Sequence, residues 1–339
     1  MNNLFYLGWL ILMDWKDKKV LVTGAGGFIG SHLVERLLSL HAEVTCFVRY
    51  TSLNQWGFLE ELPEKDLLNI ISADLKDSDA VRKAIKNQEI IFHLAAAVSI
   101  PNSYEFPREH LQTNIMGTFN VLQAAKEYDV NKVVHLSSSE VYGTAVEIPI
   151  NENHPLQGQS PYSATKIAAD KLAESFYLSF DVPVAIARPF NTFGPRQSAR
   201  AIIPNIIIQA LSSNKVIIGN DKPTRDFNYV SNTVDGLMGI AQSEKATGEV
   251  INLGSGSEIS IGDVTKKIIS IINKDVKIVQ EKERFRPEKS EVMRLIADNT
   301  KAKELIGWRP KISFEEGLEK TINWISKNLK LYKSNLYNK

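Results

Sequence analysis

Short apolar runs rich in β-branched residues alternate along the chain with segments whose apolar residues recur every three or four positions. The first run is Val20 to Thr23, and the segment after it repeats apolar residues at helical spacing from Ile29 to Leu40. Further apolar runs follow at residues 43–48, 70–73, 90–97 and 133–136. Continuous apolar strands separated by amphipathic helices are typical of parallel sheets that are buried on both faces. The pattern therefore predicts an α/β fold, a doubly wound parallel sheet with helices on both sides.

A glycine-rich segment, Gly24 to Gly30, joins the first predicted strand to the first predicted helix. Strand, turn and helix form the context that a dinucleotide-binding fingerprint requires, here with the spacing G-x-x-G-x-x-G. Gly24 would allow the tight turn, Gly27 would let the backbone approach a pyrophosphate, and Gly30 would let the helix pack on the strand. With Phe28 and Ile29, they would hold the phosphates at the helix N-terminus, where free N–H groups favour an anion. A glycine turn without a ligand is the alternative.

The ends of the later strands supply further candidate cofactor contacts. The second strand ends without the acid that commonly holds the adenosine ribose of NAD. Arg49 stands there, and it would either neutralise the 2′-phosphate of NADP or lie over the adenine. Asp74 follows the third strand, where an acid can accept from the adenine amino group, and small residues end the fourth. The cofactor contacts expected beyond the glycine segment are Arg49, Asp74, Leu75, Ala95, Ala97 and Asn114.

Tyr162 and Lys166 open a predicted helix that begins at Ser160 and Pro161, two helix-start signals. Their spacing of four residues places both side chains on one helix face. A lysine ammonium beside a phenol stabilises the phenolate and lowers a tyrosine pKa that is ordinarily about 10. The hydroxyl of Ser138 could hydrogen-bond the same substrate oxygen. Together the three groups form a site suited to oxidising an alcohol while a hydride leaves to a nicotinamide, which adds Tyr162 and Lys166 to the cofactor contacts.

The glycine segment, Ser138 and the Tyr162/Lys166 pair, in this order, resemble the extended short-chain dehydrogenase/reductase family of nucleotide-sugar epimerases and dehydratases. The resemblance runs from about residue 14 to about residue 327. It implies a Rossmann-type sheet with a smaller C-terminal α/β substrate lobe, and a tightly bound NAD that is reduced and reoxidised within one turnover. It also implies a homodimer, paired through the helices around Asn102–Tyr128 and Tyr162–Phe180. The expected sheet domain is 14–187 with about 226–254, the lobe is 188–225 and 255–330, and 1–12 are an extension before a start at Met13.

The same resemblance suggests how a nucleotide sugar would be held. Asn191 lies in a segment that enters the substrate lobe, and it would contact the diphosphate. Arg225 lies in an R-D-F-x-Y-V segment and would meet phosphate or nucleoside, while Arg286 lies in a loop that usually reaches the nucleotide. Arg196 completes the expected substrate contacts. For Arg225 and Arg286 the alternative is a solvated or ion-paired arginine.

The residues after Ser138 bear on the type of reaction. Dehydratases of this group usually carry Asp-Glu there, and this chain carries Ser139 and Glu140. A glutamate can take the C5 proton once C4 is a ketone, so Glu140 favours C5/C6 chemistry and a 4-keto-6-deoxy product. Ser139 leaves two routes open, loss of water by a 4,6-dehydratase and internal C4-to-C6 hydride transfer on an already unsaturated sugar. The alternative reaction is plain 4-epimerisation of a UDP-sugar. The alternative outside the enzymes is a sensor that binds NAD(P) without catalysing a reaction.

The wider motifs resemble enzymes of bacterial legionaminate and pseudaminate routes, which act on N-acetylhexosamine nucleotides. This resemblance favours a UDP-linked substrate derived from UDP-GlcNAc.

Forty Lys and Arg against thirty-nine Asp and Glu give a formal charge of +1, which does not indicate nucleic-acid binding. Cys46 is the single cysteine, so no intramolecular disulfide forms and a reducing cytoplasm is expected. The six histidines show no close pair at metal-ligand spacing. The apolar stretch Leu4–Met13 is about half the length of a membrane-spanning helix, so no membrane attachment is expected.

Overall fold

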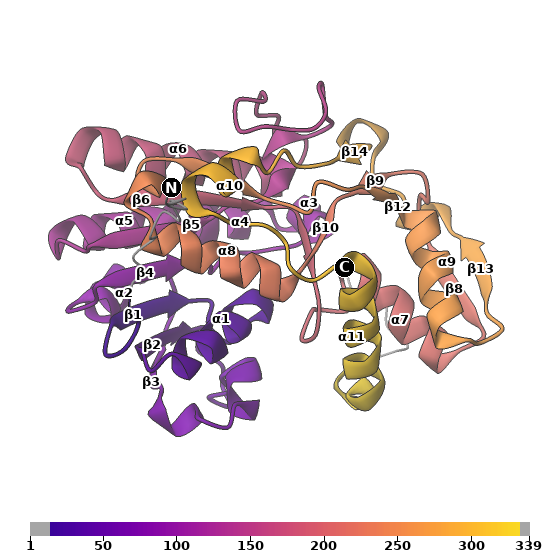
Figure 1. The fold of residues 1–339 in the computed structure, drawn as a ribbon, viewed down its shortest axis with the longest axis horizontal. Coiled ribbons are helices and arrows are strands. Elements are labelled where there is room, and N and C mark those ends of the chain that lie inside the picture. The colour runs from indigo at the N-terminus through magenta and orange to yellow at the C-terminus, as the bar shows by residue number, and fades with distance from the viewer. Residues whose placement is uncertain (1–13, 333–339) are drawn as a thin grey trace, which may run out of the picture.

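A computed structural model describes residues 14–332, and its centre is one parallel seven-stranded sheet (Figure 1). The strand order is β11-β6-β5-β4-β1-β2-β3. From β1, which lies inside the sheet, the chain adds β2 and β3 on one side and then crosses over to add β4, β5, β6 and β11 on the other. The carboxyl ends of β1 and β4 therefore form the switch point, where sheets of this kind bind ligands. The strands are β1 (Lys19–Thr23), β2 (Glu43–Val48), β3 (Asn69–Ser72), β4 (Ile90–His93), β5 (Lys132–Leu136), β6 (Val184–Pro189) and β11 (Val250–Leu253). The predicted doubly wound α/β fold is confirmed.

Apolar side chains alternate between two cores, one on each side of the sheet. In β1, Val20 and Val22 pack into one core and Leu21 into the other. The first core also holds residues of α1 (Phe28–Ser39) and α8 (Val230–Gln242). The second holds residues of α2 (Ser78–Ile85), α5 (Gly117–Glu127) and α6 (Pro161–Phe180). Because both sheet faces are covered, the strands read as continuous apolar runs.

A smaller lobe stands beside the sheet, built mostly from the last third of the chain (Figure 1). Its strands are β7 (Asn191–Phe193), β8 (Lys215–Ile218), β9 (Thr224–Arg225), β10 (Phe227–Tyr229), β12 (Ile259–Ser260), β13 (Lys277–Gln280) and β14 (Arg294–Leu295). Its helices are α7 (Ile202–Ser212), α9 (Ile261–Ile272) and α11 (Phe314–Lys327). The expected boundary at residue 187 falls inside β6, which continues to Pro189. The helix α10 (Thr300–Ile306) packs on α8 and β11, so it joins the sheet domain although it lies within 255–330.

The expected long helix around Asn102–Tyr128 is wrong in detail. The chain forms α3 (Ile100–Glu105), α4 (Pro107–His110), a π-helical turn at Leu111–Met116 and then α5. Pro107 explains the first break, because a proline can open a helix but cannot continue the preceding one.

The fourth apolar run also ends earlier than predicted. The strand stops at His93, and the backbone N–H groups of Leu94 and Ala95 donate to the hydroxyl of Thr23, at 3.1 Å each. Because these amides bond a side chain and not a neighbouring strand, residues 94–97 form a loop at the switch point.

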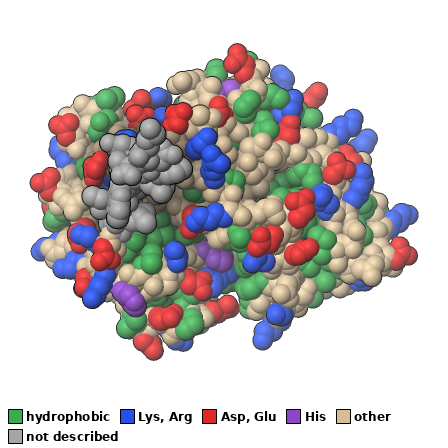
Figure 2. Space-filling view, in the orientation of Figure 1, with side chains coloured by type: hydrophobic (Ala, Val, Ile, Leu, Met, Phe, Trp, Pro, Cys, Tyr) green, Lys and Arg blue, Asp and Glu red, His purple; other side chains and the backbone are tan. Residues whose placement is uncertain are grey.

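Charged side chains of both signs are mixed over the face seen in Figure 2, in keeping with the formal charge of +1. Cys46 is buried in β2. Across residues 14–332, no helix is both long and apolar enough to span a membrane. Within the same range, no three His, Cys, Asp or Glu side chains converge as metal ligands would. The expected extension at 1–12 and the apolar stretch at its end lie outside the described residues.

Candidate active site

The glycine turn after β1 has the backbone geometry of a phosphate cradle. Gly24 has φ +70°, and a Cβ there would lie 2.9 Å from backbone atoms of Ala95. Gly27 is the N-cap of α1 and provides no side-chain cap, so N–H groups of the first turn, which begins with Phe28 and Ile29, remain free for an anion. A Cβ on Gly27 would meet only the Gly24 carbonyl oxygen, at 3.2 Å, so this side of the turn is open to a ligand.

A cavity of about 400 Å³ lies beside this turn and collects several of the expected cofactor contacts. Gly24, Arg49, Asp74 and Leu75 line it together with the loop from Ala95 to Val98. Sequence reasoning missed Asn102, Glu109, Thr113 and Arg200, which complete the lining from distant parts of the chain. The cavity and the open glycine turn fit a dinucleotide with its pyrophosphate at the N-terminus of α1.

Asn114 contributes to this cavity indirectly. It is buried and does not line the cavity; its Oδ1 accepts from the N–H of Ala97 at 2.7 Å. Its Nδ2 donates to the Ala97 carbonyl oxygen at 3.1 Å and to the Thr165 hydroxyl at 3.0 Å. Asn114 thus has a structural role, in which it fixes the loop at the cavity wall. Its contact with the cofactor stays a prediction.

The helix α6 presents the tyrosine and the lysine side by side. It begins with a capping box in which Ser160 and Ser163 bond each other's backbone N–H. Lys166 is buried, and its Nζ donates to the Leu136 carbonyl oxygen at the end of β5, at 2.7 Å. Burial lowers the pKa of Lys166 to about 8, and the charge of Asp170 opposes this. The ammonium is thus anchored at the carboxyl end of the sheet.

The hydroxyl of Tyr162 meets Ser138. Burial raises the pKa of Tyr162 to about 12; the hydrogen bond from Ser138 opposes this, while the negative charges of Glu140 and Asp170 add to it. The phenol is therefore protonated at neutral pH, and it needs a nearby positive charge to act as a base. Lys166, one helical turn away, supplies one such charge.

Ser139 and Glu140 lie on a 3-10 turn, Ser139–Tyr142, and not on an extended segment. Ser138 is the N-cap of this turn, and its Oγ accepts from the N–H of Glu140 at 3.2 Å. Ser139 is buried, whereas Glu140 is half-buried and exerts its charge on both Tyr162 and Arg225. The turn, and not strand alternation, brings the carboxylate to the tyrosine.

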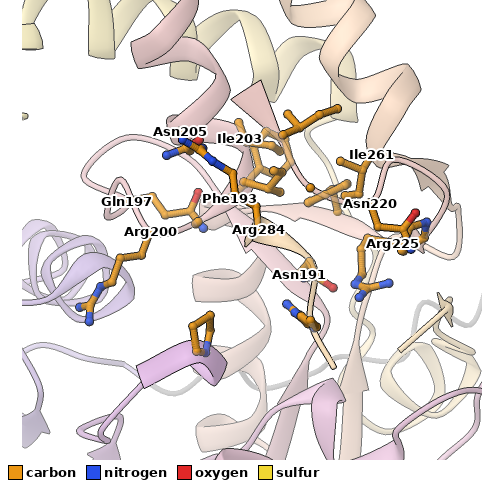
Figure 3. Close-up of a pocket in the computed structure, with 18 of the residues that line it drawn as sticks. Asn191, Phe193, Gln197, Arg200, Ile203, Asn205, Asn220, Arg225, Ile261 and Arg284 are labelled. Carbon is orange, nitrogen blue, oxygen red and sulfur yellow. The ribbon is translucent and has the colours of Figure 1, made fainter. Parts of the chain in front are cut away.

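A second cavity, of about 270 Å³, is lined mostly by residues of the lobe, among them Asn191 and Arg225 (Figure 3). Arg286 lines it as well. Glu291 lies between the two arginines, with its Oε1 3.7 Å from Arg225 Nη2 and 3.8 Å from Arg286 Nη1. Asn191 Oδ1, Gln197 Oε1 and Arg286 Nη1 are buried and find no hydrogen-bond partner within residues 14–332. Buried polar atoms without partners are rare, so these three suit a polar ligand. Polar lining residues that the sequence did not suggest are Gln197, Arg200, Asn205, Asn220, Arg284 and Glu291.

Arg196 is not among the residues that line this cavity, and its expected substrate contact stays a prediction. It has φ +66°, and its Nη1 lies 2.9 Å from Glu35 Oε2 and 3.5 Å from the Ser31 hydroxyl, both on α1. Burial and the charge of Arg196 lower the pKa of the neighbouring His32 to about 4. Arg196 therefore ties the loop that enters the lobe to the helix of the glycine turn.

The Rossmann-type sheet, the glycine turn and the Tyr–Lys pair on α6 together define the extended short-chain dehydrogenase/reductase class. Residues 21–321 match the family model described as GDP-mannose 4,6 dehydratase, and the chain belongs to this family.

Curated relatives and solved structures match nearly the whole chain. A putative UDP-glucose 4-epimerase of Methanocaldococcus jannaschii is 32% identical, over 91% of this chain and 99% of its own. The dTDP-glucose 4,6-dehydratase DesIV of Streptomyces venezuelae, solved with NAD bound, superposes with a TM-score of 0.85 at 26% identity and covers 93% of this chain and 98% of its own. A UDP-N-acetylglucosamine 4-epimerase of Methanobrevibacter ruminantium gives 0.82 at 33% identity, covering 92% and 99%. The chain is thus an NAD-dependent enzyme of the nucleotide-sugar epimerase and dehydratase type.

Proposed function

We propose that this enzyme oxidises C4 of a UDP-linked N-acetylhexosamine derived from UDP-GlcNAc and, through chemistry at C5 and C6, releases a 4-keto-6-deoxy sugar. The observation that carries the proposal is the position of Glu140, whose charge acts on both Tyr162 and Arg225. A carboxylate between the tyrosine and the substrate cavity has no role in simple inversion at C4. It is suited to removing and returning a proton at the neighbouring carbon, C5.

The tyrosine and the serine act on the C4 hydroxyl. Ser138 holds the C4 oxygen, and Tyr162 removes its proton as the C4 hydride departs. NAD held at the glycine turn after β1 would accept that hydride and later supply it again. The ammonium of Lys166 stabilises the phenolate form of Tyr162, which burial otherwise disfavours.

Glu140 then acts on the ketone. A C4 carbonyl acidifies the C5 proton, so the Glu140 carboxylate takes this proton. In the dehydration route the C6 hydroxyl leaves as water with the proton that Tyr162 removed from the C4 hydroxyl. The hydride from C4 is returned to C6 and the proton to C5, which gives the 4-keto-6-deoxy product. The net change of this route is the loss of one water molecule.

Ser139 supports the second route. Its side chain is buried and carries no carboxyl group, so it offers no acid of the kind that protonates a leaving C6 hydroxyl in most dehydratases of this group. On a sugar that is already unsaturated between C5 and C6, no leaving group remains, and the site transfers hydride from C4 to C6 with a proton added at C5. Both routes use Tyr162 and Lys166 in the same roles, whereas Glu140 removes and returns the C5 proton in the first route and only donates a proton to C5 in the second.

The residues of the substrate cavity favour a sugar that is linked to a nucleoside diphosphate. Arg225 and Arg286 provide two guanidinium groups, which match phosphate geometry, and Asn191 lines the same cavity with an Oδ1 that has no partner within the described chain and can accept from a hydroxyl or N–H of the ligand. The solved UDP-N-acetylglucosamine 4-epimerase supports an N-acetylated UDP-sugar, as does the resemblance to legionaminate and pseudaminate enzymes. We place the reaction in the cytoplasm, because Cys46 is a buried free thiol.

Mass spectrometry of the nucleotide sugar tests the proposal. The NAD-loaded protein is incubated with UDP-GlcNAc, and in a parallel sample with its 5,6-unsaturated derivative. A product lighter by one water molecule from UDP-GlcNAc identifies the dehydratase. An isobaric 4-keto product from the unsaturated sugar identifies internal hydride transfer. Conversion of UDP-GlcNAc only to its isobaric C4 epimer would overturn the proposal in favour of an epimerase.

A further inference from the structure

A buried carboxylate lies one helical turn beyond the catalytic lysine. Tyr162, Lys166 and Asp170 are each four residues apart in α6, so they share one face of the helix. Asp170 is 1% exposed, and its Oδ2 accepts from Arg188 Nε at 3.0 Å and lies 3.0 Å from Arg188 Nη2. Its Oδ1 lies 3.4 Å from Nε2 of His135, on β5. Only one of the two oxygens is thus taken by the arginine.

Neutral groups close the space around this carboxylate. His135 stacks on His93 with ring centroids 5.4 Å apart, and His93 is held by the hydroxyls of Thr23 and Thr118 at 2.9 and 3.0 Å. Burial lowers the pKa of both histidines, and the charge of Lys166 adds to this, so both rings are uncharged at neutral pH. The charges left in this buried group are those of Asp170, Arg188 and Lys166.

We propose that Asp170 is a positioning residue for the reaction: its carboxylate, fixed by Arg188, keeps Lys166 charged beside Tyr162. The inference rests on the proposed function of Tyr162 and Lys166 as a proton-transfer pair. Asp170 touches neither substrate nor cofactor in this scheme, and it acts only through the lysine.

The physical reason is the low polarity of the site. An ammonium that is removed from water loses solvation, and a negative charge nearby compensates for part of that loss. Asp170 is the carboxylate that opposes the burial of Lys166. Burial alone would raise the pKa of Asp170, but the nearby His135 and the charge of Arg188 outweigh it and hold the pKa below its usual range. The carboxylate therefore stays ionised throughout the neutral range.

The groups that face Lys166 come from several elements, and each bears on its titration. They are Tyr162 and Asp170 on α6, His135 on β5, His93 on β4, Arg188 on β6 and, beyond Tyr162, Glu140 on the 3-10 turn and His110 on α4. Among them, Asp170 is the group whose negative charge favours the ammonium. Loss of the Asp170 charge thus removes the favourable partner of Lys166.

The titration of Lys166 measures this directly and needs no substrate. NAD-loaded protein with ¹³C-labelled lysine is titrated by NMR, and the Lys166 signal is assigned by its loss in Lys166→Met. The wild-type signal is expected to titrate near pH 8. Asp170→Asn should move the midpoint down by about one pH unit, whereas Asp170→Glu should largely retain it. The matched control is Asp181→Asn, at the exposed end of the same helix, which should leave the midpoint unchanged.

Arg188→Gln is a second variant, in case Asp170→Asn does not fold. Removing the arginine takes away the charge that fixes the Asp170 carboxylate and helps to hold its pKa low, so the carboxylate is more readily protonated and the Lys166 midpoint should move down. An unchanged midpoint in either folded, NAD-loaded variant would overturn the proposal.

Turnover of UDP-GlcNAc gives the second readout. Asp170→Asn should lose about fivefold more activity near pH 8 than near pH 6, because its ammonium deprotonates earlier. An equal loss at both pH values indicates a merely structural role and overturns the proposal. Absence of turnover in the wild type contradicts the proposed function instead, and leaves the NMR result to decide the role of Asp170.

Discussion

Gly30 stands so close to Gly24 that a Cβ on Gly30 would lie 2.2 Å from the Gly24 carbonyl oxygen. This contact joins the end of β1 to the first turn of α1, and the obstacle is backbone, which cannot rotate away. A side chain at Gly30 therefore has to push the helix off the strand. We therefore expect an alanine substitution to have different effects at Gly30 and at Gly27 of the same motif.

Gly30→Ala should reduce both stability and NAD content, with a loss of about 1–3 kcal/mol in the free energy of unfolding. Gly27→Ala is the matched variant, because its Cβ would meet the same oxygen at 3.2 Å and otherwise face open space. It should keep the unfolding temperature while retaining less NAD. Thermal unfolding and nucleotide quantitation check both, and equal behaviour of the two variants would contradict this division of roles.

Tyr162→Phe should lower turnover by about 10²–10⁴-fold, because it removes the proton acceptor at C4 while keeping the ring. Retained NAD and an unchanged unfolding temperature would show that the variant is intact. Activity within a few-fold of the wild type would exclude Tyr162 as the C4 base.

Glu140 should exchange the hydrogen at C5. Product formed in D₂O is expected to carry deuterium at C5, and Glu140→Gln should abolish turnover while transient oxidation at C4 stays visible as NADH absorbance. The carboxamide keeps the size of the side chain but cannot accept the proton. An unlabelled C5 in the wild-type product, or full activity of Glu140→Gln, would favour a plain epimerase.

The protein should form a homodimer through the outer faces of α5 and α6. Leu111 and Met116, on the π-helical turn that leads into α5, and Phe119, on α5, leave 49%, 47% and 36% of their surface exposed. Leu178 and Phe180 on α6 leave 72% and 48%. Large apolar side chains that gather on two neighbouring helices indicate a contact surface. Light scattering should return about twice the chain mass of 38.0 kDa. Leu178→Glu should weaken the dimer, while Leu53→Glu, 75% exposed after β2, should not; a wild-type monomer at micromolar concentration would refute the prediction.

The nucleotide that stays bound through purification should be NAD. Asp74 and the exposed Arg49 both line the cavity, and the related dehydratase DesIV was solved with NAD bound. Denaturing the protein and resolving the released nucleotide gives the answer. Recovery of NADP alone would contradict this prediction and indicate that Arg49 selects the 2′-phosphorylated nucleotide.

The sequence by itself determined the parts that depend on near neighbours in the chain. The strand, glycine turn and helix from β1 to α1 follow from about ten consecutive residues, and the common face of Tyr162 and Lys166 follows from helical spacing. The fold class followed as well, because apolar runs alternating with amphipathic helices have few ways to bury both sheet faces. These features are encoded locally, so they can be read without knowing what packs against them.

Only the tertiary structure decided which distant residues meet. Asn114 binds the loop at Ala97, Arg196 reaches Glu35 on α1, and the 3-10 turn carries Glu140 to Tyr162. Asp170 meets Arg188 across a helix and a strand, in a contact that no spacing rule predicts. The physical reason is that burial and charge depend on the whole set of neighbours, so the same side chain can bind a ligand, pin a loop or neutralise another charge. The reactive groups were thus visible in the sequence, whereas the environment that sets their protonation came from the fold.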